Sequence, residues 1–157
     1  MGDLTLPAPD APAEEWGRLA VRIPGWRWMP GMQEADVDDL GPDRVHRLIA
    51  SRDPDPEHPT GWSRWCDRRS GSIACMEPAK GTPDPDDPAT AGCLLRLLLP
   101  PPTLGHVTQV LPPMSVAREW QVLVDTQWGR HTGKGPNLGR ACIAAAAALG
   151  RWPGGAP

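Results

Sequence analysis

The chain has 157 residues and a formal net charge of −3, and charged residues make up 22% of it. This length suits one domain with a single hydrophobic core, although 21 Pro and 17 Gly keep much of the backbone out of regular elements. The balance of apolar and charged residues excludes the disordered class, and neither half of the chain is basic enough for a dedicated nucleic-acid-binding protein.

Membrane insertion and secretion are not expected. The longest apolar run, CLLRLLLPPP from Cys93, is interrupted by Arg96 and ends in prolines, which argues against a transmembrane helix. The first residues, MGDLTLPAPDAPAEEW, lack the basic region and the apolar stretch of a signal peptide. We therefore expect a cytoplasmic protein without membrane contacts.

The chain has eight Trp but no Phe or Tyr. The rare residue types are those with AT-rich codons, which indicates a GC-rich genome. Because the Trp side chains must supply all of the aromatic packing, they are expected to form much of the core. Periodicity places five of them there: Trp16, Trp26, Trp28, Trp120 and Trp152.

In chain order, residues 1–12 carry three prolines and no apolar period, and are expected to form a flexible tail before a single α+β domain over 13–157. A helix follows, with Glu14 and Glu15 in its first turn and an end at Pro24-Gly25. A second helix is predicted to begin at Pro42. The apolar faces of these two helices are Trp16, Leu19, Ala20 and Ile23 in the first, and Val45, Leu48 and Ile49 in the second.

Residues 51–87 are rich in Pro and Asp and are predicted to be largely irregular, with one short strand at Ser72–Met76. WSRWCDRR, within this stretch, alone mixes aromatic and basic residues, a combination that stacks on bases and neutralises phosphates. The alternative is a packed Trp beside solvated Arg side chains. We expect at least one of the two Trp to be exposed, and the candidate contact residues of this 62–69 patch are Trp62, Arg64, Trp65, Arg68 and Arg69.

The third predicted helix has Asp86 or Asp87 as its N-cap and Pro88 as its first residue. Prolines at 100–102 end it, and strands are expected in HVTQVL, in REWQVLVD and over Gln127–Thr132. The last helix is predicted from about Pro136 to Arg151. Its buried stripe is predicted as Leu138, Ala141, Cys142, Ala145, Leu149 and Trp152, and its opposite face as Arg140, Ala144, Ala147 and Arg151.

The four cysteines, at 66, 75, 93 and 142, form no close pair and no C-x-x-C motif. A zinc site built from them would need the distant His58, His106 or His131, whereas structural zinc sites use short, repeated ligand spacings. We expect four reduced thiols, no metal and no cofactor.

The stretch WGRHTGKGPNLG is similar to a phosphate-binding loop, but its spacing does not fit one. A Walker loop has four residues between its glycines and a hydroxyl residue after the Lys, whereas Gly129 and Gly133 are separated by three residues and Gly135 follows Lys134. We interpret the stretch as a strand-to-helix connector in which glycines supply φ freedom. The alternative is an anion site at the helix N-terminus, the 130–139 loop, with Arg130, His131, Gly133, Lys134, Gly135 and Asn137.

Several segments together carry a family resemblance: a helix ending in GWRW, a helix after PDPDDP, and strands followed by GKGPNLGRACIAAAAAL. They resemble small phage and prophage proteins of the phage ABA-sandwich domain family. The resemblance implies an α/β sandwich and a phage or prophage origin, and it implies no chemistry.

The fold class expected is α+β, with helices packed on a small, mostly antiparallel sheet. No neighbourhood of Ser, His and Asp or of Cys and His is evident, so an enzyme is not expected. We expect an accessory protein that binds a host or phage macromolecule, first of all a protein, with inhibition of a host defence system as one such role. The alternative is a small-anion or nucleotide binder that uses the 130–139 loop, and the oligomeric state is left open.

Overall fold

The structure is a computed structural model that describes residues 4–35, 44–49, 62–67, 73–78, 81–99, 107–114 and 118–154. The fold is α+β, as the sequence predicts, and every strand pair is antiparallel. The helices are α1 (Ala13–Arg22), α2 (Pro88–Leu98) and α3 (Leu138–Leu149). The strands are β1 (Arg44–Ile49), β2 (Trp62–Asp67), β3 (Ile73–Pro78), β4 (Val107–Leu111), β5 (Trp120–Thr126) and β6 (Gly129–Gly135).

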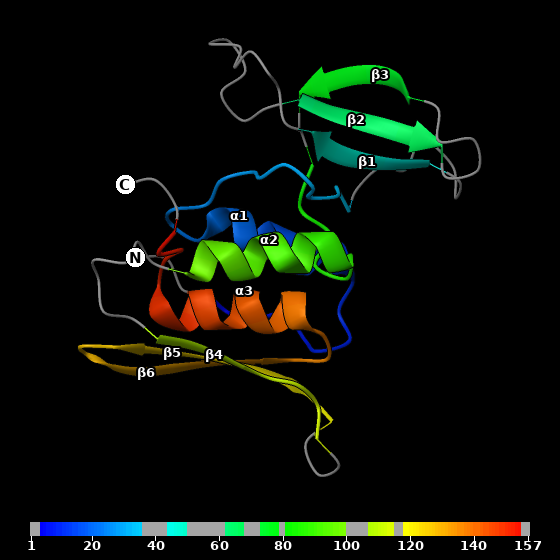
Figure 1. Ribbon diagram of the computed structural model, residues 1–157. Coiled ribbons are helices and arrows are strands. Elements are labelled where there is room, and N and C mark those ends of the chain that lie inside the picture. Colours follow the sequence, from blue (N-terminus) through cyan, green and yellow to red (C-terminus); the bar gives the residue numbers. More distant parts are fainter. Residues whose placement is uncertain are drawn as a thin grey trace.

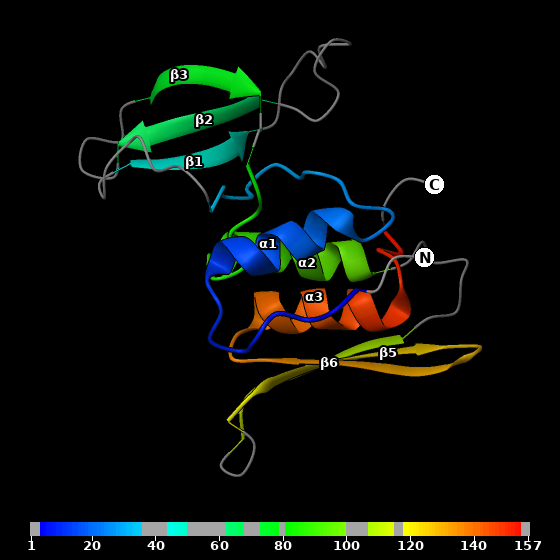
Figure 2. The ribbon, with the colours of Figure 1, turned by 180° about the vertical axis from the view of Figure 1, so that it is seen from behind.

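Helix α3 is the centre of the molecule. Figures 1 and 2 show it between the sheet β4–β5–β6 on one side and helices α1 and α2 on the other. A helix enclosed in this way is expected to be apolar on both faces, and residues 139–146, which are all buried, are apolar except for Arg140. The run of alanines in α3 therefore serves close packing on two faces at once.

The sheet β4–β5–β6 presents one face to α3. Val122 and Val124 of β5 are fully buried, and their register partners on β4 are Val110 and Thr108. The alternation that the sequence predicts for Trp120, Val122 and Val124 is thus confirmed, with Trp120 partly buried against the core.

Local signals explain the ends of α2 and α3. Asp87 caps α2, its carboxylate accepting a hydrogen bond from Thr90 N at 2.8 Å, and Pro88 is the first helical residue. Asn137 caps α3 through Arg140 N at 2.9 Å. Gly150 ends α3 in the left-handed conformation, with a φ of 77°. The predicted cap of α2 is confirmed; for α3 the sequence left Pro136 as the first helical residue or Asn137 as the cap, and the structure has Asn137 as the cap.

The middle of the chain differs from the prediction. The helix predicted to begin at Pro42 is wrong, because Arg44–Ile49 forms β1 and pairs with β2. Three apolar residues in so short a window do not separate a helical from an extended period, and strand pairing decides between them. Within 51–87, expected to be largely irregular, the structure has β2 and β3, and β3 overlaps the strand predicted at Ser72–Met76.

Tryptophans do form part of the core. Trp16 and Trp152 are buried. The ring centroid of Trp26 lies 6.0 Å from the ring centroid of Trp152 and 5.7 Å from that of Trp28. Trp26 and Trp28 are partly buried against the core. The exposure of Trp62 and Trp65 lies outside what the structure describes.

Of the cysteines, Cys142 is buried in α3, where burial raises the pKa of its thiol, and Cys93 is half-buried on α2. Both lie on helix faces, as predicted. No helix among the described residues has the length and apolar character needed to cross a membrane.

Candidate functional site

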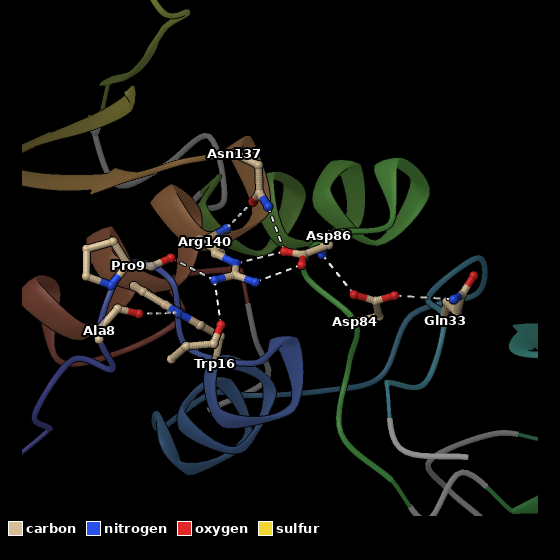
Figure 3. A network of polar contacts seen from close by, with 9 residues as sticks. Ala8, Pro9, Trp16, Gln33, Asp84, Asp86, Asn137 and Arg140 are labelled. Atoms are coloured by element: carbon tan, nitrogen blue, oxygen red, sulfur yellow. Dashed lines mark hydrogen bonds and ion pairs between the residues drawn. The ribbon is translucent and has the colours of Figure 1, made fainter. Parts of the chain in front are cut away.

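Arg140 is the centre of the largest polar network among the described residues (Figure 3). It lies in the first turn of α3, where its side chain was predicted to face away from the core. This prediction is wrong: Arg140 is only 7% exposed and its guanidinium is turned into the molecule. A buried Arg needs acceptors for its N–H groups, and two separate segments accept four hydrogen bonds from Arg140.

The first segment is the loop before α2. Asp86 accepts hydrogen bonds from Arg140 Nε and Nη2, both at 2.7 Å, in a bidentate ion pair. The amide of Asn137 donates a further bond to the same carboxylate at 2.6 Å. The hydrogen bonds from Arg140 hold the pKa of Asp86 below its ordinary value. This carboxylate lies beside the N-terminus of α3, where negative charge is stabilised by the helix dipole.

The second segment is the N-terminal stretch expected to be a flexible tail. Arg140 Nη1 donates to the carbonyl oxygens of Pro9 at 2.8 Å and Ala11 at 2.7 Å. The indole of Trp16 donates to Ala8 O at 3.2 Å, and the guanidinium carbon of Arg140 lies 5.8 Å from the Trp16 ring. These contacts hold residues 8–11 against α1 and α3, and the mobility of the stretch stays a prediction.

Asp84 extends the network toward the loop that follows α1. Its carboxylate accepts from Asp86 N at 2.9 Å and from Gln33 Nε2 at 3.3 Å, and burial raises the pKa of Asp84. Gln33 N in turn donates to Thr90 Oγ1 at 2.8 Å. The network thus connects α1, α2 and α3 and acts as a structural clamp, because its donors and acceptors are directed at one another. Across the described ranges no cluster of three His, Cys, Asp or Glu suited to a metal ion occurs.

The 62–69 patch is placed only in part. Trp62, Arg64 and Trp65 lie in β2, the central strand of the sheet β1–β2–β3. Arg64 is opposite Arg47 of β1 and Met76 of β3. Arg68 and Arg69 lie outside the described residues. Whether these residues bind a partner stays a prediction.

The residues of the 130–139 loop are placed in full, and they do not converge on one point. Arg130 pairs with Asp125 at 2.6 Å, and its hydrogen bonds lower the pKa of that carboxylate. The ring nitrogen Nδ1 of His131 lies 3.0 Å from Ala148 O. Lys134 is exposed in β6, while the Asn137 side chain is held between Arg140 N and Asp86.

Gly133 and Gly135 have a different role from the predicted one. Neither has a positive φ, so conformational freedom does not account for them. Both are buried in β6 against α3. A Cβ at Gly133 would overlap Ala145 N and Ala141 O, and a Cβ at Gly135 would lie 2.8 Å from Ala141 N. The two glycines let β6 approach the helix backbone.

The β5–β6 hairpin carries an exposed residue that sequence analysis did not single out. Trp128, in the turn between the strands, is 74% exposed, the largest exposed fraction among the large apolar side chains described. Thr126 Oγ1 accepts from Trp128 N at 3.1 Å and donates to Gly129 O at 3.0 Å. Gly129, with a φ of 136°, closes the turn. The signal available in the sequence was the Trp-Gly pair at 128–129, since a Gly after a strand indicates a turn and Trp128 directly precedes it.

Neither a protein-family model nor a curated protein or solved structure matched the sequence. The candidate site therefore rests on geometry alone. The geometry shows two features: a structural clamp around Arg140, and an exposed aromatic residue, Trp128, at the tip of the β5–β6 hairpin.

Proposed function

We propose that this chain is an accessory protein that binds a protein partner, and that Trp128 at the tip of the β5–β6 hairpin is the principal contact residue. In keeping with the resemblance, the proposal places it in a phage or prophage, where inhibition of a host defence system is one role for such a binder. The observation that carries the proposal is the exposure of Trp128 on an ordered turn.

Exposure of an indole to water is unfavourable, because burying a large aromatic side chain releases ordered solvent and gains dispersion contacts. Trp is also the residue type most enriched among those that dominate the binding energy of protein interfaces. The turn is already fixed by the two Thr126 hydrogen bonds, so a partner that covers Trp128 would order little additional backbone.

The anion-binding alternative has less support. The acceptor position beside the α3 N-terminus holds the carboxylate of Asp86, which is bonded to both Asn137 and Arg140. An incoming phosphate would meet this negative charge. Arg130 is paired with Asp125 on the strand side. Of the residues predicted for an anion site, Arg130 is thus paired with Asp125 and Asn137 is bonded to Asp86.

The test is affinity capture with the wild type, Trp128→Ala and a control, Leu99→Ala, each compared by quantitative mass spectrometry and then by titration of the purified partner. Leu99 is another exposed apolar residue, distant in the chain from the hairpin. We expect Trp128→Ala to weaken binding by about tenfold or more, as for residues that dominate an interface, and Leu99→Ala to leave it unchanged. All three proteins should have the same melting temperature. Equal binding by the wild type and Trp128→Ala would overturn the proposal.

A further inference from the structure

The sheet β4–β5–β6 has two edges that differ in their protection. Its order leaves β4 and β6 at the edges, and in the described part of the chain no strand pairs with the outer side of β4. The edge strand of a sheet presents unpaired N–H and C=O groups that can pair with another strand. Proteins protect such edges with charged residues, prolines, bulges or a covering segment.

Strand β6 carries this protection and β4 does not. Arg130, His131 and Lys134 lie in β6, whereas β4 has the sequence VTQVL, with no charge, no proline and no glycine. Its register with β5 runs without a bulge from Val107 to Leu111. Pro112 and Pro113 follow directly, so the unprotected edge ends at Leu111.

From this edge we propose that two copies of this chain pair through β4, antiparallel and about a two-fold axis at Gln109. A second copy fits because the strand is electrically neutral: self-pairing of β4 places no like charges opposite each other, whereas self-pairing of β6 would bring Arg130 and Lys134 of both copies together. The two-fold axis makes the interface isologous, as in most homodimers.

The register follows from the length of the strand. When Val107–Leu111 is paired with itself over its whole length, Gln109 lies opposite Gln109 and residue 108 opposite residue 110. Residues opposite each other share one face of a sheet, so both α3 helices cover the same face of one continuous six-stranded sheet. The exposed side chain of Leu111, 42% accessible in one copy, then lies at the junction of the two copies.

The exposed fractions on this edge agree with the proposal. Leu111, the last residue of β4, and Met114, three residues further on, are two of the five large apolar residues that are exposed among those described. Gln109 is exposed on the sheet face that α3 does not cover. A dimer through β4 would shield part of this apolar surface.

The experiment compares the oligomeric state of four full-length proteins by sedimentation equilibrium: wild type, Gln109→Lys, Gln109→Glu and Thr132→Lys. Thr132 is exposed in β6, so its substitution adds the same charge at the other edge. We expect the wild type and Thr132→Lys to form dimers, and each Gln109 variant to dimerise about fivefold more weakly because like charges face each other at the axis. An equal mixture of Gln109→Lys and Gln109→Glu should recover dimerisation, because opposite charges then meet.

Circular dichroism of each variant shows whether it is folded, and recovery of dimerisation in the mixture requires that both Gln109 variants are folded. A wild type that stays monomeric at the highest soluble concentration would overturn the proposal. So would Gln109→Lys dimerising as strongly as the wild type, or Thr132→Lys dissociating to the same extent as Gln109→Lys.

Discussion

Replacing Arg140 by Ala should cost a large part of the stability of this protein. The side chain donates two hydrogen bonds to Asp86 and one each to Pro9 O and Ala11 O. The bonds to Asp86 contribute modestly, because that carboxylate is 42% exposed and water can replace the guanidinium. Each carbonyl loses a bond to a charged group, about 1 kcal/mol apiece, and the contact with the Trp16 ring adds roughly 0.5 kcal/mol.

The total loss expected is roughly 3 kcal/mol, against a stability of about 5 to 15 kcal/mol for a typical domain. Urea unfolding followed by Trp fluorescence measures it, and the midpoint should fall by about 1 to 2 M. Arg140→Lys keeps the charge but lacks the planar fork, so we expect an intermediate loss. The N-terminal stretch should also become more susceptible to proteolysis in Arg140→Ala, because Pro9 and Ala11 lose their donor.

The matched control is Arg96→Ala, which removes an exposed Arg from the last turn of α2 and should change stability by less than about 0.5 kcal/mol. If Arg140→Ala unfolds at the same midpoint as Arg96→Ala, the network is not a structural clamp. Unchanged proteolysis of residues 4–12 in Arg140→Ala would refute the part of the reasoning that concerns the N-terminal stretch.

The remaining predictions concern Gly133, the carboxylates of Asp86 and Asp84, and Lys134. Gly133→Ala should destabilise the fold by roughly 3 kcal/mol or prevent folding, because a Cβ at this position overlaps the α3 backbone. The control is Gly92→Ala, in open space on α2, which should stabilise the fold by about 1 kcal/mol. Thermal unfolding measures both variants, and equal melting temperatures would contradict the close approach of β6 to α3. Asp86, with a lowered pKa, stabilises the fold above its ordinary pKa of 3.8 and loses this contribution as the pH falls below it, so Asp86→Asn should flatten the acid limb of stability against pH. Asp84, with a raised pKa, affects stability in the opposite direction, because its stabilising contribution is present below pH 3.8 and is lost as the pH rises through the pKa of the folded state. Asp84→Asn should therefore gain stability at neutral pH relative to acid pH. Parallel curves of stability against pH for Asp86→Asn and Asp84→Asn would refute the two pKa directions. Lys134→Ala should change neither stability nor calorimetric titration with nucleotides, and tight nucleotide binding that disappears in this variant would restore the anion-site hypothesis.

Local sequence signals predicted the elements whose ends are decided by adjacent residues. The cap of α2 needs only Asp87, Pro88 and a nearby N–H group, and the cap of α3 needs only Asn137 and the amide of Arg140. Strand β5 could be predicted because buried and less buried side chains alternate along it, with Val122 and Val124 as the buried ones. The helix predicted from Pro42 failed because a window as short as β1 takes its conformation from the strand beside it.

The role of Arg140 could not be predicted in the same way, because it depends on segments far away in the chain. A helical wheel puts Arg140 opposite Ala141 and Cys142, and a lone Arg opposite an apolar stripe is normally solvated. In this fold both faces of α3 are covered, so the position is buried and the side chain needs acceptors from the Pro9 and Asp86 segments. One property of the sequence did indicate that α3 is covered on both faces: the run ACIAAAAAL contains no polar residue that could form a solvent-exposed face. A helix without a polar face is buried all round, and a charged residue in its first turn then has to be paired inside the protein.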